Sequence, residues 1–379
     1  MKNKLTTALA TSLCALGFVS QSNAQTTVTG NLDIAYNAVS TKNNVSGGGS
    51  YRGFGRESQI NFANKGKLSN GMGYEAGFSL EIDGNEAMGS STAISTFAGS
   101  DDNTSTMENI YINFLLGPNT ALTIGADHGL NSDVTLTNPV GFGYLGIQGV
   151  NNAGSIYPTS LNAASFGIGI KQNSPILNFQ GMYQPTGSKG GGSMNDTFHN
   201  ATGANTDQGF RNSRIELTAR GSLGVKGLDV LAAVAKEKAA KELTASAEDV
   251  DGRRFAARYN FGSVTVAGDY IQSAGGNITR AGQTGTTTQN HTTKGKSGSV
   301  SYAIDKDLSV AYTRSVASAS TGSLTSGLLV DEKVHMVAVG YNLGPVLAQV
   351  QYRKGEGAGG ASGITGEGEI VQVRLGTRF

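Results

Sequence analysis

The sequence predicts an all-β fold, a sixteen-stranded antiparallel β-barrel that spans a membrane. Three observations carry this prediction. Apolar and polar residues alternate with a period of two along most of the chain, the alternating segments number sixteen, and short and long connections follow one another between them. The composition fits a β architecture, because glycine supplies 55 of 379 residues while only 6 are proline and 15% are charged.

The first segment of the chain has the features of an export signal. Basic residues at 2 and 4 precede an apolar stretch at 5–19, and Ser22-Asn23-Ala24 places small residues before a cleavage site. We therefore predict that residues 1–24 are a signal peptide that is removed, and that 25–379 form a single barrel domain. The one cysteine, Cys14, lies in the removed segment, so no disulfide is expected.

Alternation identifies the strands in order. In the first, Val28, Leu32 and Ile34 alternate with Asn31 and Asp33, and the later segments follow the same rule. The predicted strands lie at about 28–37, 59–62, 74–82, 109–116, 122–127, 166–171, 177–183, 214–220, 227–236, 253–261, 263–273, 296–304, 307–317, 333–343, 345–354 and 368–379. Around 228–235 and 334–341 both faces are apolar or small, so the alternation leaves their orientation open.

The connections alternate in length. Short turns are predicted at 67–71, 117–120, 173–174, 221–226, 262, 305–306 and 344, and long loops at about 40–55, 83–106, 129–162, 185–210, 237–252, 274–294, 318–331 and 355–367. Short periplasmic turns on one rim and long extracellular loops on the other are typical of outer-membrane barrels. All six prolines fall in these connections or at strand ends, where no ladder hydrogen bond is lost.

A closed barrel explains why the pattern alternates. Lipid offers no hydrogen-bond partner, so every backbone group must pair within the protein while side chains point alternately to lipid and to the lumen. A soluble β-sandwich or solenoid is the alternative, but sixteen strands are many for a sandwich and no short repeat is present. A formal net charge of +1 supplies no basic surface for nucleic acid, so no nucleic-acid partner is expected.

The candidate functional residues are charges on the inward-facing positions. Acids gather on the early strands and arginines on the later ones, so the two signs either face each other across a water-filled lumen or pair with their neighbours. The predicted pore-lining set is Asp33, Glu75, Glu81, Asp127, Asp133, Arg214, Arg258, Arg353 and Arg374. Arg214, Arg258 and Arg374 are expected near mid-strand, hence near mid-height, where they favour a slight preference for anions. Arg220 and Arg254 are also predicted to face inward.

Three segments resemble a known family. Residues 57–81, residues 109–125 and the C-terminal strand 371–379, which ends in Phe379, are similar to the corresponding segments of Gram-negative trimeric porins. The resemblance implies a sixteen-stranded barrel, a homotrimer, and a long third loop, here 129–162, folded into the pore. It also implies that the barrel-assembly machinery reads Phe379, and that outer-membrane lipid and lipopolysaccharide surround the barrel.

The expected function is passive diffusion of small hydrophilic solutes and ions through the outer membrane of a Gram-negative bacterium, which the chain reaches by the secretory pathway. The alternative is a substrate-specific channel, or an adhesin whose loops bind a partner, built on the same barrel. No enzymatic activity, cofactor or metal is expected, because the four histidines lack metal-ligand spacing and no nucleophile motif is present.

Overall fold

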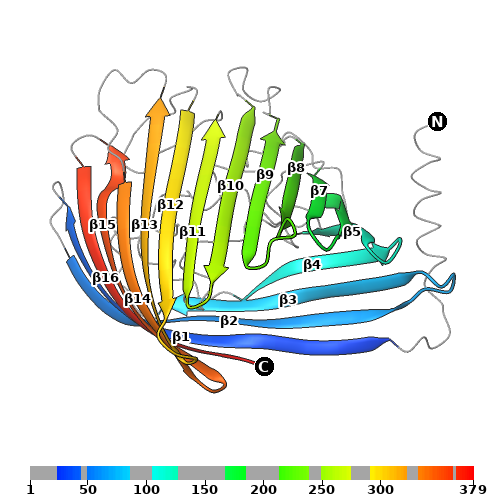
Figure 1. The fold of residues 1–379 in the computed structure, drawn as a ribbon, viewed down its shortest axis with the longest axis horizontal. Helices are drawn as coiled ribbons and strands as arrows, with labels where there is room; N and C mark the ends of the chain where they lie inside the picture. Colours follow the sequence, from blue (N-terminus) through cyan, green and yellow to red (C-terminus); the bar gives the residue numbers. More distant parts are fainter. Residues whose placement is uncertain are drawn as a thin grey trace, which may run out of the picture.

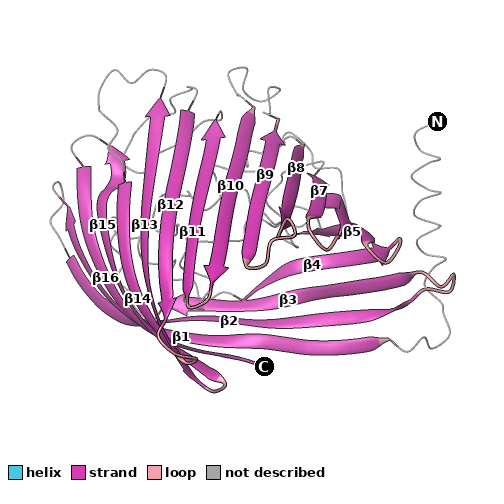
Figure 2. Cartoon of the chain, viewed as in Figure 1, coloured by secondary structure: helices cyan, strands magenta, loops and turns pink. Residues whose placement is uncertain are grey.

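Sixteen antiparallel strands form a closed barrel in the computed structural model. The structure describes residues 24–43, 49–85, 105–126, 167–184, 213–238, 249–274, 291–321, 332–361 and 364–379, so the proposed signal peptide lies almost wholly outside it. Each strand pairs with its neighbours in sequence, and the first pairs with the last, as the adjoining blue and red strands show in Figure 1. Every described element is a strand (Figure 2). The predicted fold class is confirmed.

The strand bounds follow the predicted order. The first eight are β1 (Gln25–Asn43), β2 (Gly49–Lys67), β3 (Gly73–Asn85), β4 (Ser105–Leu115), β5 (Thr120–Ala126), β6 (Gly167–Gln172), β7 (Asn178–Gln184) and β8 (Arg214–Gly221). The second eight are β9 (Leu228–Glu237), β10 (Val250–Phe261), β11 (Val264–Ala274), β12 (His291–Ala303), β13 (Leu308–Thr321), β14 (Glu332–Leu343), β15 (Val346–Ala361) and β16 (Ile364–Arg378). No helix within the described ranges is long and apolar enough to cross a membrane.

Two of the predicted long loops are mostly strand. The prediction placed loops at 40–55 and 355–367, but β1 and β2 stay paired as far as Thr41 and Gly49, and β15 and β16 as far as Ala361 and Ile364. Both segments are rich in glycine and small residues, so side-chain alternation fades there. Ladder hydrogen bonds use the backbone alone, and the pairing continues, with register shifts after Glu356.

The two faces of the wall differ as a lipid-spanning barrel requires. Large exposed apolar side chains such as Leu217, Phe255 and Val350 lie on the outer face, while their sequence neighbours point inward and are largely polar. The structure also resolves the two ambiguous strands. Their small or apolar buried residues face inward, whereas Val234, Val337 and Val339 are exposed on the outer face. The inward residues are Leu231, Ala233 and Ala235 on β9 and Val334, Met336 and Ala338 on β14.

Local chemistry sets the short turns. Two-residue turns join β10 to β11 and β14 to β15, with Gly262 at a φ of 70° and Gly344 at a φ of 73°, which side chains with a Cβ rarely adopt. In the turn before β13, the Asp305 carboxylate accepts hydrogen bonds from the backbone N–H groups of Asp307 and Leu308, both at 2.7 Å. These bonds lower the pKa of Asp305 below its ordinary value.

A β-bulge interrupts the pairing of β3 and β4. Asn109 adopts a φ of 50° where three steps on β4 match two steps on β3, between Gly77 and Ser79. Its side-chain amide donates to the Ser79 hydroxyl at 2.9 Å. The extra residue shifts the inward and outward alternation of β4 by one position relative to β3.

The C-terminal residue completes the ring. Gly30 and Phe379 exchange two backbone hydrogen bonds, at 2.8 and 3.0 Å, beyond the last residue of β16. The Phe379 ring covers Gly30 so closely that a Cβ added at position 30 would lie 2.8 Å from a ring carbon. An aromatic ring thus fills the space that the glycine leaves on the outer face.

Candidate functional site: the charged inner wall

The inner wall carries the residues that a permeating solute would meet. Of the predicted pore-lining set, Asp127 and Asp133 lie outside the described residues, as does the third loop at 129–162. Arg214 is the first residue of β8, at the loop end rather than near mid-strand, and its side chain lies outside the described part. Arg258 lies in the half of β10 nearer the short turn. Arg214 and Arg258 therefore do not lie at the middle of their strands, where they were expected.

Arg374 and Asp33 join the two strands that close the barrel. The Arg374 guanidinium donates to the Asp33 carboxylate at 2.8 Å, from β16 to β1, and both side chains are nearly buried. The two residues are diagonal neighbours, since Asp33 is opposite Gly376 and Arg374 is opposite Ala35. Of the two alternatives predicted for the inward charges, these two residues therefore pair with a neighbour and do not face each other across the lumen. The pair contributes no net charge to the lumen.

Glu75 is also paired locally. Lys65, directly opposite Glu75 in the β2–β3 ladder, lies 2.9 Å from the carboxylate, and the Tyr111 hydroxyl donates to the same group at 3.4 Å. The two remaining predicted residues, Glu81 on β3 and Arg353 on β15, occupy inward-facing positions and are partly exposed. The structure thus brings the predicted acids and arginines into separate contacts along the wall and does not gather them at one point.

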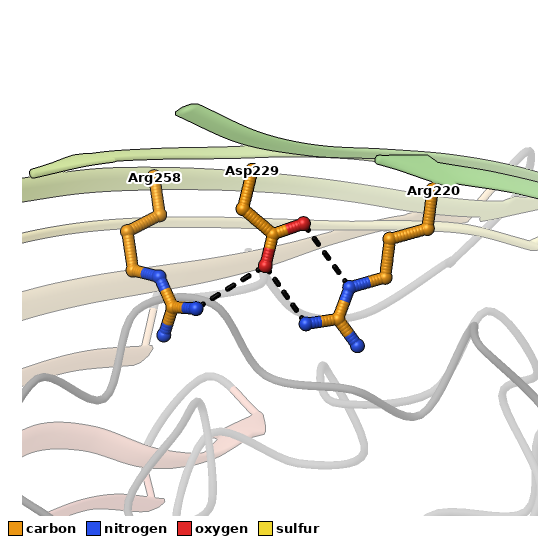
Figure 3. A network of polar contacts seen from close by, with 3 residues as sticks. All are labelled: Arg220, Asp229 and Arg258. Carbon is orange, nitrogen blue, oxygen red and sulfur yellow. Dashed lines mark hydrogen bonds and ion pairs between the residues drawn. The ribbon is translucent and has the colours of Figure 1, made fainter. Parts of the chain in front are cut away.

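A three-residue cluster on β8, β9 and β10 leaves a net positive charge, and Figure 3 shows its side chains on one side of the sheet. Asp229 lies between two arginines. Arg220 binds it through two hydrogen bonds, Nε to Oδ1 at 3.1 Å and Nη2 to Oδ2 at 2.8 Å. Arg258, opposite Asp229 in the β9–β10 ladder, donates to Oδ2 at 3.2 Å. One carboxylate cannot neutralise two guanidinium groups, and all three side chains keep some exposure.

A second arginine–aspartate pair lies further along the same wall but is inaccessible. Arg254 on β10 donates its Nε to Oδ1 of Asp269 on β11 at 3.1 Å, and its Nη2 donates to the other carboxylate oxygen. The two side chains are only 1% and 0% exposed. Two parallel hydrogen bonds between planar groups are the strongest form of such a pair. A permeating ion cannot reach these charges, so their role is structural.

Neutral amides line the wall beside the closure. The Gln351 amide donates to Gln372 at 2.6 Å, and the Gln372 amide donates to Asn37 at 2.7 Å, which forms a chain across β15, β16 and β1. The three side chains meet because Gln372 is directly opposite Gln351 in one ladder and directly opposite Asn37 in the other. Gln351 is buried, whereas Gln372 and Asn37 are half-buried, so these two amides offer hydrogen bonds to water and polar solutes without a field of one sign.

Sequence reasoning missed the acids that partner the later arginines. Asp229 lies in the segment whose alternation was ambiguous, and Asp269 lies on a strand whose inward face was not assigned. A search for acids on the strands next to each inward arginine could have found both aspartates, but it requires the register of the strands. Among the described residues there is no group of three or more His, Cys, Asp or Glu side chains that could hold a metal ion.

Comparisons with known proteins agree with this architecture. A family model described as Gram-negative porin matches residues 6–360, whereas no curated protein sequence matches the chain significantly. Among solved structures, the Salmonella typhi OmpF complex with daunomycin superposes with a TM-score of 0.64 at 14% identity, covering 93% of this chain and 97% of that one. The anion-selective porin from Comamonas acidovorans gives 0.62 at 15% identity, covering 94% and 100%. The trimer form of in-vitro folded OmpT from Vibrio cholerae gives 0.55 at 11% identity, covering 94% and 99%.

Proposed function

Because the chain belongs to the Gram-negative porin family, we propose that it is an outer-membrane channel for passive diffusion of small hydrophilic solutes with a weak preference for anions. The observation that carries the anion preference is the Arg220–Asp229–Arg258 cluster. Its charges of +1, −1 and +1 sum to +1, whereas the Arg374–Asp33 and Lys65–Glu75 pairs are each neutral. The porin from Comamonas acidovorans, which has the same fold, is described as anion-selective, and this supports the proposed preference.

The expected preference is small. A unit charge acts on an ion about 10 Å away in water with about 0.4 kcal/mol, less than the thermal energy of about 0.6 kcal/mol. The Debye length of about 10 Å at 0.1 M salt shrinks to about 3 Å at 1 M, so the preference should fade as salt rises. A channel of this kind sorts ions by a modest bias and lets neutral polar solutes pass.

The test is the reversal potential across a planar bilayer in a dilute KCl gradient. Arg258→Gln should move the potential toward cation preference, and Asp229→Asn should move it toward anions, because each removes one charge of opposite sign from the same cluster. Arg253→Gln is the matched control, since the neighbouring Arg253 is exposed on the outer face of the same strand. Equal shifts from Arg258 and Arg253, or no shift from either cluster variant, would refute the assignment.

The proposal includes assembly. We infer a homotrimer, supported by the family and by the trimer form of the structurally similar OmpT. We further infer that the barrel-assembly machinery recognises the C-terminal strand, which ends in Phe379. The two backbone hydrogen bonds between Phe379 and Gly30 support this inference, because they complete the closure of the barrel. Cross-linking of the purified protein should give a ladder that ends at three subunits.

A further inference from the structure

We propose that the short-turn end of the inner wall binds a chain of phosphate groups, such as an oligophosphate or the phosphate tail of a nucleotide. The site is a basic arc on the five consecutive strands β6–β10, formed by Lys171, Asn178, Arg220, Asp229 and Arg258. It extends the cluster of Figure 3 by two strands. The inference rests on the proposed channel function, because a solute reaches the arc only through a water-filled lumen.

Every member of the basic arc lies close to a short turn. Lys171 is one residue before the end of β6, Asn178 is the first residue of β7, and Arg220 is one residue before the end of β8. Asp229 is the second residue of β9, and Arg258 is three residues before the end of β10. Short turns mark the periplasmic rim of an outer-membrane barrel. The arc therefore surrounds part of the periplasmic mouth of the lumen.

The ladder register places the arc on the inner face. Lys171 is directly opposite Gln180, which is buried on the inner wall. Asn178, two residues from Gln180 on the same strand, is directly opposite Arg220. Residues directly opposite each other share a face, as do residues two apart on one strand. Lys171 and Arg220 thus flank β7 on the lumen side with their Cα atoms about 12 Å apart, two strand spacings across and two residues along.

The basic arc carries a positive charge that the described side chains do not neutralise. Its three cations and one carboxylate give a net charge of +2. Among the described residues, Lys171 forms no ion pair. The Glu75 carboxylate acts on Lys171 electrostatically, but Lys65 already binds it at 2.9 Å. An anion from solution can therefore supply the missing negative charge.

Free hydrogen-bond donors point away from Asp229. Arg220 uses Nε and Nη2 to bind this carboxylate, and Arg258 uses only Nη2. Within the described ranges the Nη1 atoms of both arginines have no partner, and Figure 3 shows the remaining terminal nitrogen of each guanidinium directed away from the carboxylate. The Asn178 carbonyl accepts a hydrogen bond from the backbone N–H of Ser174 at 3.0 Å, which leaves its NH₂ group as a donor. Many donors beside two occupied carboxylate oxygens suit an oxyanion.

The spacing of the donors favours an anion with several charged groups. Both Nη2 atoms donate to Oδ2 of Asp229, at 2.8 and 3.2 Å, so their separation cannot exceed the sum of these distances. Lys171 lies further along the arc, beyond β7. A chloride ion or a single phosphate contacts only part of this row, whereas successive phosphates of a chain can pair with the arginines and with Lys171. Each phosphate also brings more acceptor oxygens than a carboxylate does.

The test measures binding of sodium tripolyphosphate to the full-length mature protein in detergent by isothermal titration calorimetry at low salt. Lys171→Gln should weaken binding by about ten-fold, as expected when a charge-assisted hydrogen bond is lost. Lys306→Gln is the matched control and should change nothing, because Lys306 lies in another periplasmic turn and its side chain is 89% exposed. Asn178→Asp keeps the acceptor for Ser174 but adds a negative charge, so it should also weaken binding. It serves if Lys171→Gln fails to fold, with folding judged by heat-modifiable mobility.

Single-channel recording tests the position of the site and the class of ligand. Each channel has one orientation in a planar bilayer, so tripolyphosphate should lower the current much more strongly from one chamber than from the other. ATP should act like tripolyphosphate, whereas inorganic phosphate and citrate should act about ten-fold more weakly or less. The site is overturned by equal block from both chambers, by equal binding of inorganic phosphate or citrate, or by unchanged binding in Lys171→Gln. Binding of ATP without binding of tripolyphosphate would also overturn it, because the nucleoside would then be the recognised group.

This outcome can be told apart from that of the proposed anion preference. The reversal potential follows the net charge of the Arg220–Asp229–Arg258 cluster, whereas tripolyphosphate binding also requires Lys171. If Arg258→Gln shifts the potential while tripolyphosphate does not bind, the site is wrong and the anion preference stands. If tripolyphosphate binds as expected while the potential does not shift, the preference is wrong and the site stands.

Discussion

The buried Arg254–Asp269 pair predicts a large loss of stability from a small chemical change. Asp269→Asn keeps the size and shape of the side chain but removes its charge. Arg254 would then remain on the inner wall with 1% of its side chain exposed, and the charged acceptor of these two hydrogen bonds would be lost. Water cannot replace the lost partner at a site with so little exposure.

The magnitude follows from the burial of the two groups. Removing one partner of a buried pair usually costs about 3–5 kcal/mol, because the remaining charge is uncompensated. Asp251 on β10, the strand that carries Arg254, provides the matched control. Its side chain is 64% exposed and lies 3.8 Å from Lys236, so Asp251→Asn should cost about 0–1 kcal/mol. The same substitution should therefore differ by at least about 2 kcal/mol between the two sites.

The assay is equilibrium urea unfolding of the barrel refolded into lipid vesicles, followed by the loss of tyrosine fluorescence and of heat-modifiable mobility. A double variant, Arg254→Met with Asp269→Leu, should recover much of the loss, because apolar groups of similar volume often replace a buried pair without penalty. If Asp269→Asn and Asp251→Asn lower the free energy of unfolding equally, burial does not decide the value of these pairs and the reasoning fails.

Three further predictions concern the ends, the lipid face and a turn. Deleting Phe379 should impair insertion with little effect on synthesis or export, and normal levels of heat-modifiable barrel after the deletion would contradict this. Leu217→Arg should lower folded yield, since a charge on the lipid face costs about 2–4 kcal/mol at the midplane, whereas Leu217→Met should fold well. The lowered pKa of Asp305 means that its carboxylate stabilises the turn above the ordinary aspartate pKa of about 3.9 and loses that effect as pH falls through the lower folded value. The stability difference between the protein and Asp305→Ala should therefore be present at neutral pH and shrink in strong acid, and a difference independent of pH would argue against it.

Alternation predicted the strands because lipid and water impose opposite demands on neighbouring residues. It succeeded where the contrast is strong, as on β16, whose outward Val371, Val373 and Leu375 alternate with Gln372 and Arg374. It could not orient β9, where the inner face is as apolar as the outer one. That strand carries Asp229, so the same ambiguity hid the central residue of the charged cluster.

The pairing of charges could not be obtained from one strand at a time. Arg374 and Asp33 lie at opposite ends of the sequence, and only the closure of the ring makes them diagonal neighbours. The sequence identified both as inward-facing, and it raised local pairing as one possibility. To decide whether the charges face each other across the lumen or pair locally, the register between neighbouring strands must be known. Alternation does not fix this register, because a shift by two residues leaves every side chain on the same face.

Closure of the ring separates two sets of constraints that most proteins must satisfy with the same residues. The diameter of the barrel depends on the number of strands and on their stagger, and both are properties of the backbone. One set of side chains then meets lipid while the alternate set meets solute, so substitutions that retune permeation need not disturb anchoring, nor the reverse. Divergence can proceed on each surface at its own pace, which is consistent with barrels that still superpose at 14% and 15% identity.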